Sequence, residues 1–376
     1  GDDEGTVWLP IDAKFPGDTY ATAVSYAQGD VGELRIPASV AYGGMTYAVQ
    51  GINFTCSGDQ ALTSAVIEAP IGSLQDGFFS GCTALRSADI SALPLSYVPN
   101  NLFSECTALT AVSLPESAVG IGDYAFSGCT ALEEFTVPAA VTSMGSGLFS
   151  GCTSLSRLIF ADSKEPALAF SYDFFAELGS LQSLYVGRNL EVDYNGVFSN
   201  AARLTKATFG GEATYVPGRI FWQAPALEEV EIGGKVDSVG WAAFAECPKL
   251  ASVVLPEGLR VVDYDAFQGD SLLAQISLPA GLQVLGSGAF SGCSRIEELT
   301  VPAGIRRLPD YLFSGCTRLR SLSLPEGLEA LGSGTFSDCA SLTEVPIPEA
   351  IRELPESVFY GWSGLDSIAI PENIEV

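Results

Sequence analysis

Residues 289–311 read AFSGCSRIEELTVPAGIRRLPDY, and the same pattern begins again at residue 312 with LFSGCTRLRSLSLPEGLEALGSG. The two stretches share a phenylalanine, a Ser-Gly-Cys turn, alternating apolar residues and a proline at a 23-residue spacing. Such a period is typical of a solenoid, in which each coil buries its apolar side against the coils before and after it. One phenylalanine marks each copy: Phe79, Phe103, Phe126, Phe149, Phe175, Phe198, Phe221, Phe244, Phe267, Phe290, Phe313, Phe336 and Phe359.

Each copy predicts one short strand and a proline that ends it. In residues 132–155, Leu132, Phe135 and Val137 are apolar, and the last two alternate with a polar residue, as in a strand with one buried face. Pro138 follows, and proline has no N–H with which to continue a sheet. A second apolar pair predicts a short second strand or loop, and the stretch around the phenylalanine predicts one helical or 3₁₀ turn. We therefore expect a β-rich, right-handed coil in every unit.

The length and the period together predict one folded domain with distinct ends. We expect residues 1–20 to be poorly ordered and residues 21–52 to form an atypical capping unit, with a hairpin at Gly43-Gly44. Residues 53–376 are predicted to form the solenoid, with about 14 units. The region 160–241 is irregular: the proline slot holds Ala161, Gly187, Gly210 and Gly233, the cysteine slot holds Leu178, Ala201 and Ala224, and the unit between Phe149 and Phe175 is 26 residues long.

Composition excludes several classes of partner. Eighteen Lys and Arg residues against 45 Asp and Glu residues give a formal net charge of −27. Nucleic acid and anionic membrane surfaces attract basic patches, so both are disfavoured. No apolar run approaches the roughly 20 residues of a membrane helix, and we expect no direct transmembrane span. Gly1 and the acidic stretch after it indicate export, although the sequence contains no export signal.

Nine cysteines in an exported protein would usually suggest disulfides. Eight of them, however, lie three residues after the marker phenylalanine, where other copies have Leu178 or Ala224. Side chains in such a column run parallel and do not point at one another, so we predict buried thiols rather than disulfides.

Catalytic and metal-binding interpretations find little support. The chain has no histidine, which removes Ser-His-Asp and Cys-His nucleophiles and the usual zinc-hydrolase ligands. We expect no metal and no cofactor. Pairs such as Glu297-Glu298 could supply the two carboxylates of a glycosidase, but a solvated strand face explains them better. If the coils align as proposed, Glu297 forms an ion pair with Arg320 in the next coil.

Aromatic residues gather near the irregular coils. Tyr185 lies on the predicted outer face of a strand, while Tyr172, Tyr194, Tyr215, Trp222 and Trp241 fall in nearby loops. Tyr and Trp commonly anchor protein interfaces and sugar rings. We predict a binding surface at Tyr185, Tyr215, Trp222 and Trp241; the alternative is that these rings only cover the loop side of their own coils.

The phrase Ala-Phe-Ser-Gly-Cys-Ser/Thr-x-Leu-x-x-Leu-x-Leu-Pro, as it stands in residues 289–309 and 312–332, closely resembles the leucine-rich repeats of BspA-like bacterial surface proteins. The resemblance covers roughly residues 31–376 and includes the Val-x-Tyr-Gly-Gly lead-in. It implies a leucine-rich-repeat solenoid, export, display at the cell surface by an outer-membrane lipoprotein anchor, and adhesion to proteins or other cells. It implies no active site.

The leading functional hypothesis is a monomeric, non-enzymatic surface protein that binds another protein, either of the extracellular matrix or of a cell surface. Repeats present a wide modular surface, whereas small-molecule chemistry usually needs a concave pocket. Two alternatives stay open at this point: a glycan-binding module that uses the central aromatic residues, and a structural spacer. An enzyme is the least favoured hypothesis.

Overall fold

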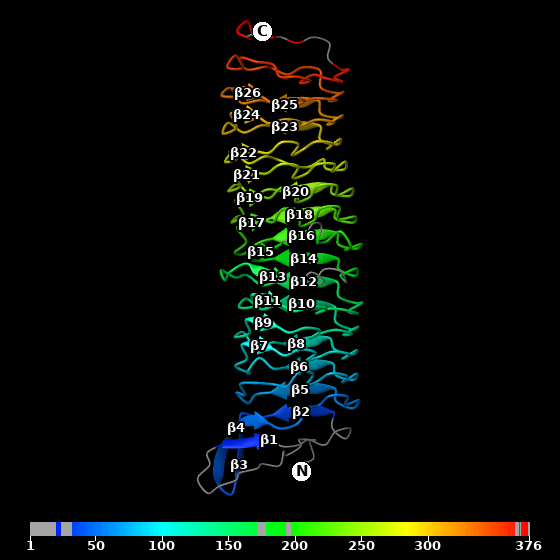
Figure 1. Cartoon of the computed structure of the whole chain (residues 1–376), viewed down its shortest axis with the longest axis vertical. Coiled ribbons are helices and arrows are strands. Elements are labelled where there is room, and N and C mark those ends of the chain that lie inside the picture. The colour runs from blue at the N-terminus through cyan, green and yellow to red at the C-terminus, as the bar shows by residue number, and fades with distance from the viewer. Residues whose placement is uncertain are drawn as a thin grey trace. The chain divides into compact units, whose positions relative to one another are not determined.

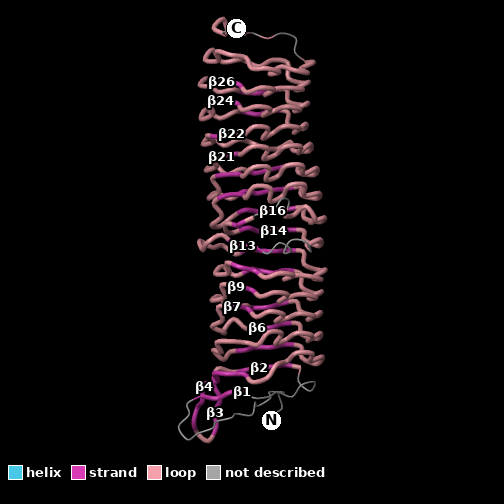
Figure 2. The backbone as a smooth tube through the Cα atoms, in the orientation of Figure 1, coloured by secondary structure: helices cyan, strands magenta, loops and turns pink. Residues whose placement is uncertain are grey.

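The computed structural model describes residues 20–23, 32–170, 178–192, 197–364, 368 and 370–374. These residues form a β-solenoid of strands and turns, as the sequence predicts, and Figure 2 shows no helix among them. No membrane-spanning helix is therefore found in the described residues. Most of the segment 1–20, predicted to be poorly ordered, lies outside the described residues, as do Tyr172, Phe175 and Tyr194. The chain divides into two compact units, Gly1–Phe160 with Leu168–Ser180, and Ala161–Ala167 with Leu181–Val376.

The first unit begins with a three-stranded sheet. Strand β4 (Met45–Ile52) lies between β1 (Tyr20–Ala23) and β3 (Ser39–Tyr42). It is antiparallel to β3. The turn between them is the predicted Gly43-Gly44, and both glycines have positive φ, 60° and 80°, which suits residues without a Cβ. That this hairpin serves as a cap stays a prediction.

Two parallel ladders follow in the first unit (Figure 1). The strand-face ladder contains β2 (Glu33–Ile36), β5 (Ser64–Ile67), β6 (Ser87–Asp89) and β8 (Ala111–Ser113), and then the pair β10 (Glu134–Val137) and β12 (Arg157–Phe160). The second ladder contains β7 (Tyr97–Val98), β9 (Gly120–Ile121), β11 (Ser143–Met144) and β13 (Leu168–Phe170). Strands of one ladder are mostly one period apart, so Glu134 pairs with Arg157.

The second unit repeats this arrangement. Its strand face contains β14 (Ser183–Val186), β16 (Lys206–Phe209), β18 (Glu229–Ile232) and β20 (Ser252–Val254), followed separately by β23 (Glu298–Thr300) and β25 (Ser321–Ser323). The second, shorter strands of the coils in this unit are β15 (Leu190–Glu191), β17 (Tyr215–Val216), β19 (Ser238–Val239), β21 (Val261–Val262), β22 (Val284–Leu285), β24 (Arg307–Leu308) and β26 (Ala330–Leu331). The register places Lys206, Glu229 and Ser252 in one column.

The marker phenylalanines form a stack inside each unit. The rings of Phe79 and Phe103 are 5.4 Å apart and nearly parallel, at 1°. In the second unit, Phe244 stacks on Phe221 at 5.6 Å and on Phe267 at 5.3 Å. All five side chains are fully buried. The strand residues alternate between buried and outward-facing positions, as the sequence pattern predicts.

In the described part of the chain, the turns around the marker phenylalanines contain no helix, so the predicted helical or 3₁₀ turn is wrong. The N–H groups of Gly288, Phe290 and Gly292 donate to Asp310, Leu312 and Ser314 of the next coil, at 2.9, 3.1 and 2.7 Å. A helix would direct these donors back along its own turn. Gly288 and Gly292 also have positive φ, 64° and 77°. Alternate N–H groups of the turn therefore bond to the neighbouring coil, as in a strand, while Ser291 and Cys293 donate back to Gly288 O and Phe290 O within the turn, at 2.8 and 3.1 Å.

The cysteines are buried thiols, as predicted, and form no disulfide. The S–H groups of the eight cysteines in the repeat slot donate to backbone carbonyls of the preceding coil. The Cys316 thiol lies 3.2 Å from Phe290 O and the Cys339 thiol 3.2 Å from Phe313 O. Burial raises the pKa of Cys339 to about 12 and that of Cys82 to about 11. The thiols therefore stay protonated at neutral pH and satisfy carbonyls that an alanine would leave without this donor.

Asp270 occupies the cysteine slot of its coil. The side chain is fully buried, and its Oδ1 accepts a hydrogen bond from the Cys247 N–H at 2.8 Å. Its Oδ2 is buried without a partner. Burial raises the pKa of Asp270 well above its usual value. A carboxylate at this position therefore destabilises the folded state whenever it is ionised.

Replacing one stacked ring should cost stability locally. Phe244→Ala is expected to lower the free energy of unfolding of its own and adjacent coils by about 3 to 5 kcal/mol, because the cavity is fully buried. Hydrogen-exchange mass spectrometry should show faster exchange around residues 221–267. Val254→Ala, at an outward position that is 59% exposed, is the control and should leave exchange unchanged. Uniform loss of protection throughout the second unit would contradict nearest-neighbour energetics.

Restoring the repeat residue at Asp270 should stabilise the protein. Asp270→Cys removes the partnerless buried oxygen and should add about 1 to 3 kcal/mol near pH 7. The pKa of Asp270 is raised in the folded state, so its ionisation destabilises the wild-type protein in full above that folded-state pKa. The destabilisation disappears below the unfolded-state pKa of about 4, where the carboxyl is protonated in both states. The difference in melting temperature should therefore shrink as the pH falls. Asp237→Asn, at an exposed carboxylate, is the control; a pH-independent difference would contradict this explanation.

Candidate functional site

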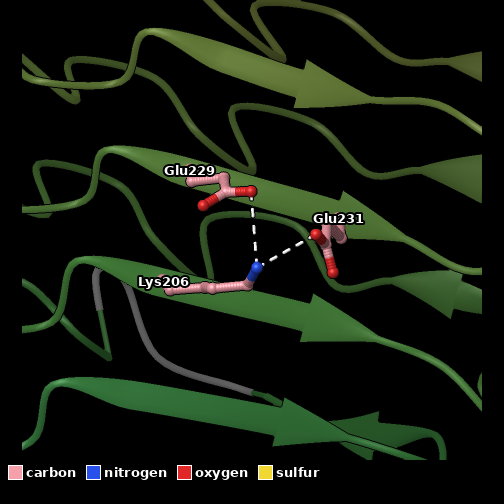
Figure 3. Close-up of polar contacts among 3 residues, drawn as sticks. All are labelled: Lys206, Glu229 and Glu231. Carbon is pink, nitrogen blue, oxygen red and sulfur yellow. Dashed lines mark hydrogen bonds and ion pairs between the residues drawn. The ribbon is translucent and has the colours of Figure 1, made fainter.

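The strand face of the second unit carries a network of charged residues. The Lys206 Nζ lies 2.9 Å from a Glu231 carboxylate oxygen and 3.3 Å from one of Glu229, as Figure 3 shows. These hydrogen bonds raise the pKa of Lys206, with Glu231 contributing most. Lys206 comes from β16 and both glutamates from β18, so the network links two successive coils.

Other ion pairs also join neighbouring coils. Arg320 lies 3.8 Å from Glu297, which confirms the predicted pair, and Arg157 lies 3.0 Å from Glu134 in the first unit. All of these side chains are about half exposed or more. Exposed ion pairs contribute little to the free energy of unfolding. Their main effect is that the basic side chains compensate the negative charge of the carboxylates along the strand faces.

Tyr185 lies on the outward side of β14. Its hydroxyl donates to Asp162 Oδ1 at 2.8 Å. A Cβ added at Gly210 would come within 2.8 Å of the Tyr185 hydroxyl, and Cβ atoms at Gly187 and Gly211 would overlap Asp162. At Gly187 and Gly210, two of the positions where glycine replaces the strand-ending proline, a side chain would therefore displace the Asp162–Tyr185 pair; at Gly233 the close neighbour is the Phe209 carbonyl instead.

Tyr215 begins β17 and is half-buried. Its hydroxyl donates to the Leu190 carbonyl of the preceding coil at 3.0 Å. Burial and the nearby Glu191 raise its pKa. The ring thus covers its own side of the solenoid, and part of it stays accessible.

Trp222 and Trp241 meet around one arginine. The Arg219 guanidinium lies 4.9 Å from the centre of the Trp222 ring and 4.2 Å from that of Trp241. Tyr264 of the next coil stacks on Trp241 at 5.4 Å and 17°. Trp241 therefore lies between Arg219 and Tyr264, and Tyr264 is 45% exposed. We call these four residues, Arg219, Trp222, Trp241 and Tyr264, the aromatic edge.

The structure brings only part of the predicted surface together. Trp222 and Trp241 form one cluster in the turns that contain the marker phenylalanines. Tyr185 lies instead on the strand face, in β14, and Tyr215 lies in β17, one of the second, shorter strands. Sequence reasoning missed Arg219, Tyr264 and Asp162. Arg219 precedes Phe221 by two residues, where several copies have glycine, and this basic residue between two aromatic coils was the available signal. Its φ of 54° matches the positive φ of Tyr124, Ala242 and Tyr311 at the same slot.

The described residues contain no group of three or more cysteine, aspartate or glutamate side chains close enough to hold a metal ion. The chemistry that the described surface offers is instead polar and aromatic contact. The two Trp rings supply contact area, Arg219 supplies a fixed positive charge, and the strand face supplies carboxylates.

The family model of the BspA type leucine rich repeat region matches residues 52–173, 169–274 and 263–376. Among solved structures, a leucine-rich repeat protein from Bacteroides ovatus is 23% identical, with 98% of this chain and 89% of that chain covered and a TM-score of 0.51. A leucine rich cell surface protein from Faecalibacterium prausnitzii is also 23% identical, with 82% and 91% covered and a TM-score of 0.40. No curated protein matches the chain. The first likeness shows a shared fold.

The Asp162–Tyr185 hydrogen bond should be visible in the titration of the phenol. Burial and Asp162 raise the pKa of Tyr185 to about 12, so it should stay protonated at pH values where an ordinary tyrosine ionises, near 10. The difference between the wild-type and Tyr185→Phe absorbance titrations near 295 nm isolates this residue. Asp162→Asn should lower the pKa toward 10, and an unchanged value in that variant would contradict the assigned partner.

Proposed function

This chain belongs to the BspA-type leucine-rich repeat family, and from that membership we propose that it is a non-enzymatic recognition protein, displayed at a bacterial cell surface, that binds another protein. Leucine-rich repeats generally serve as protein-interaction modules, and parallel ladders present side chains at a regular spacing over a wide face. Display at the surface by a lipoprotein anchor and action as a monomer belong to the same proposal.

The observation that carries this proposal is the aromatic edge. Trp222 and Trp241 are partly exposed aromatic residues beside a fixed guanidinium, and Trp and Arg are enriched among the residues that contribute most to protein interfaces. Holding Arg219 between the rings in advance lowers the entropy cost of binding. Tyr185 and Tyr215, whose hydroxyls already have partners within the chain, add accessible ring area on the other faces.

The same geometry favours a protein over a glycan. Sugar rings bind by stacking on an open aromatic face. Arg219 and Tyr264 cover the two faces of Trp241, and Arg219 also lies over Trp222. A partner protein can contact the edges of these rings and the exposed part of Tyr264, whereas a sugar would first have to displace Arg219.

The test is capture of surface proteins by the whole chain. Biotinylated protein is incubated with purified fibronectin, laminin and collagen and with surface-labelled proteins of neighbouring cells, and Kd is then measured for the partner retained. The Trp222→Ala/Trp241→Ala variant should bind that partner at least about 30-fold more weakly, since anchors of this kind are worth about 2 kcal/mol or more.

Two further variants make the result specific. Trp222→Phe/Trp241→Phe keeps aromatic rings beside Arg219. This variant should therefore retain most of the affinity that the alanine variant loses. Tyr97→Ala/Tyr124→Ala removes two tyrosines of the first unit that are 48% and 46% exposed, and should bind normally. Equal binding by all variants would contradict a role for the aromatic edge. Retention of an oligosaccharide on a glycan array, with no protein captured, would favour the glycan alternative.

A further inference from the structure

The guanidinium of Arg219 is held between aromatic rings but has no anionic partner in the described structure. Its central carbon lies 4.9 Å from the centre of the Trp222 ring and 4.2 Å from that of Trp241. The sequence holds 45 acidic residues, yet none of the ion pairs among the described residues includes Arg219. Glu246 of the next coil accepts a hydrogen bond from the Gln223 side chain instead, at 2.7 Å. The positive charge of the aromatic edge is therefore left for a group outside this part of the chain.

The nitrogen atoms of Arg219 differ in their access to solvent. The Nε atom is buried and has no hydrogen-bond partner among the described residues. A buried donor without a partner costs free energy of folding, so its presence in a native structure calls for an explanation. The two Nη atoms also lack a partner in the part of the chain that the structure describes, but they are not shut off from solvent. The rings therefore fix the guanidinium while its end stays open, and two parallel N–H groups at that end match the two oxygens of a carboxylate.

Three of the four residues of the aromatic edge can only donate hydrogen bonds. Arg219, Trp222 and Trp241 carry no side-chain acceptor. Neither indole N–H has an acceptor within the described ranges, and neither is closed off from solvent. The Trp241 indole lies against Gly218, where a Cβ would come within 2.7 Å of its Nε1, so glycine leaves room for this ring. Since the edges of aromatic rings also carry partial positive charge, the aromatic edge suits an anion that accepts hydrogen bonds.

We propose that the aromatic edge binds a carboxylate side chain of the partner protein, an aspartate or glutamate that accepts hydrogen bonds from both Nη atoms of Arg219. A planar carboxylate and a planar guanidinium form two parallel hydrogen bonds, which fix the orientation of the partner as well as its charge. Apolar residues on either side of this carboxylate would contact the ring edges and Tyr264, which is 45% exposed. This inference rests on the proposed function and adds to it the chemistry of the partner's contact residue.

The net charge of −27 limits how acidic the partner segment can be. At physiological salt, charges are screened over about 8 Å, so a single carboxylate is attracted mainly by Arg219. A run of acidic groups, or a polysulfated sugar, would also be repelled by the carboxylates elsewhere on the chain. A sialic acid carries the same carboxylate, but Arg219 and Tyr264 cover the two faces of Trp241 on which its ring would stack. These observations favour one acidic residue between neutral residues of a protein.

The test titrates the ¹⁵N-labelled whole chain with short peptides, blocked at both ends, and follows the indole N–H signals by NMR at physiological salt. The peptides alternate leucine and threonine around a central glutamate, glutamine or lysine. The glutamate peptide should bind about tenfold more tightly than the glutamine peptide, and the lysine peptide more weakly than either. The signals of Trp222 and Trp241, assigned with the single Trp→Phe variants, should shift. The signal of Trp362, whose buried indole donates to the Leu342 carbonyl, should not.

Variants of Arg219 separate its charge from its geometry. Arg219→Gln should weaken binding of the glutamate peptide about tenfold and remove the preference over the glutamine peptide. Arg219→Lys keeps the charge but loses the planar pair of donors, so its affinity should lie between those of Arg219→Gln and the wild type. Arg318→Gln removes an exposed arginine in the coil of Phe313 and should alter binding by less than about twofold. A melting temperature equal to that of the wild type checks that each variant is folded.

Two further ligands distinguish the sources of a carboxylate. Equal binding of the glutamate and glutamine peptides, or an equal loss in Arg219→Gln and Arg318→Gln, would overturn the inference. Tighter binding of sialyllactose, or of a peptide with four consecutive glutamates, than of the glutamate peptide would overturn it as well. If a captured partner depends on Trp222 and Trp241 but not on Arg219, only the carboxylate contact is wrong. If no partner is captured at all, the proposed function fails instead.

Discussion

Backbone hydrogen bonds between coils one period apart are the constraint on which the rest of the structure depends. They occur in the strands, where Lys206 pairs with Glu229, and also in the turns, where the Phe290 N–H donates to Leu312. Because both ends of each coil are bonded in the same register, residues of one slot form columns. Stacked phenylalanine rings, thiols that donate to the preceding coil and ion pairs between successive strands all follow from that register.

This constraint also explains how much of the fold could be predicted. The buried positions, the strand before most of the slot prolines (Pro115, Pro138, Pro256, Pro302 and Pro325) and the Glu297–Arg320 pair depend only on slot and period, and they were predicted correctly; no strand precedes Pro279 or Pro348. The turn was wrong because a short polar stretch around a phenylalanine is compatible with a helical turn until the neighbouring coil is considered. Alternate donors of the turn bond to that coil, and Gly288 and Gly292 take conformations that a helix does not contain.

The candidate site was less predictable because it depends on departures from the repeat. Glycines in the proline slot were visible in the sequence, but the space that Asp162 and Tyr185 take beside Gly187 and Gly210 could be seen only in the structure. The absence of a strand before Pro279 has no signal in the sequence, since the alternation of polar and apolar residues continues through Leu278.

Departures of this kind solve a problem that a uniform repeat creates for recognition. If every coil presented the same side chains, a partner could bind in several positions one coil apart with nearly equal free energy, so no single complex would dominate. Arg219 between two tryptophans and the Asp162–Tyr185 pair each occur at one level of the second unit. Such features raise the free energy of every shifted position, because a partner fitted to one of them loses that contact when it moves by a coil. The regular columns therefore supply stability, and the irregular coils supply the distinct positions that the proposed binding function requires.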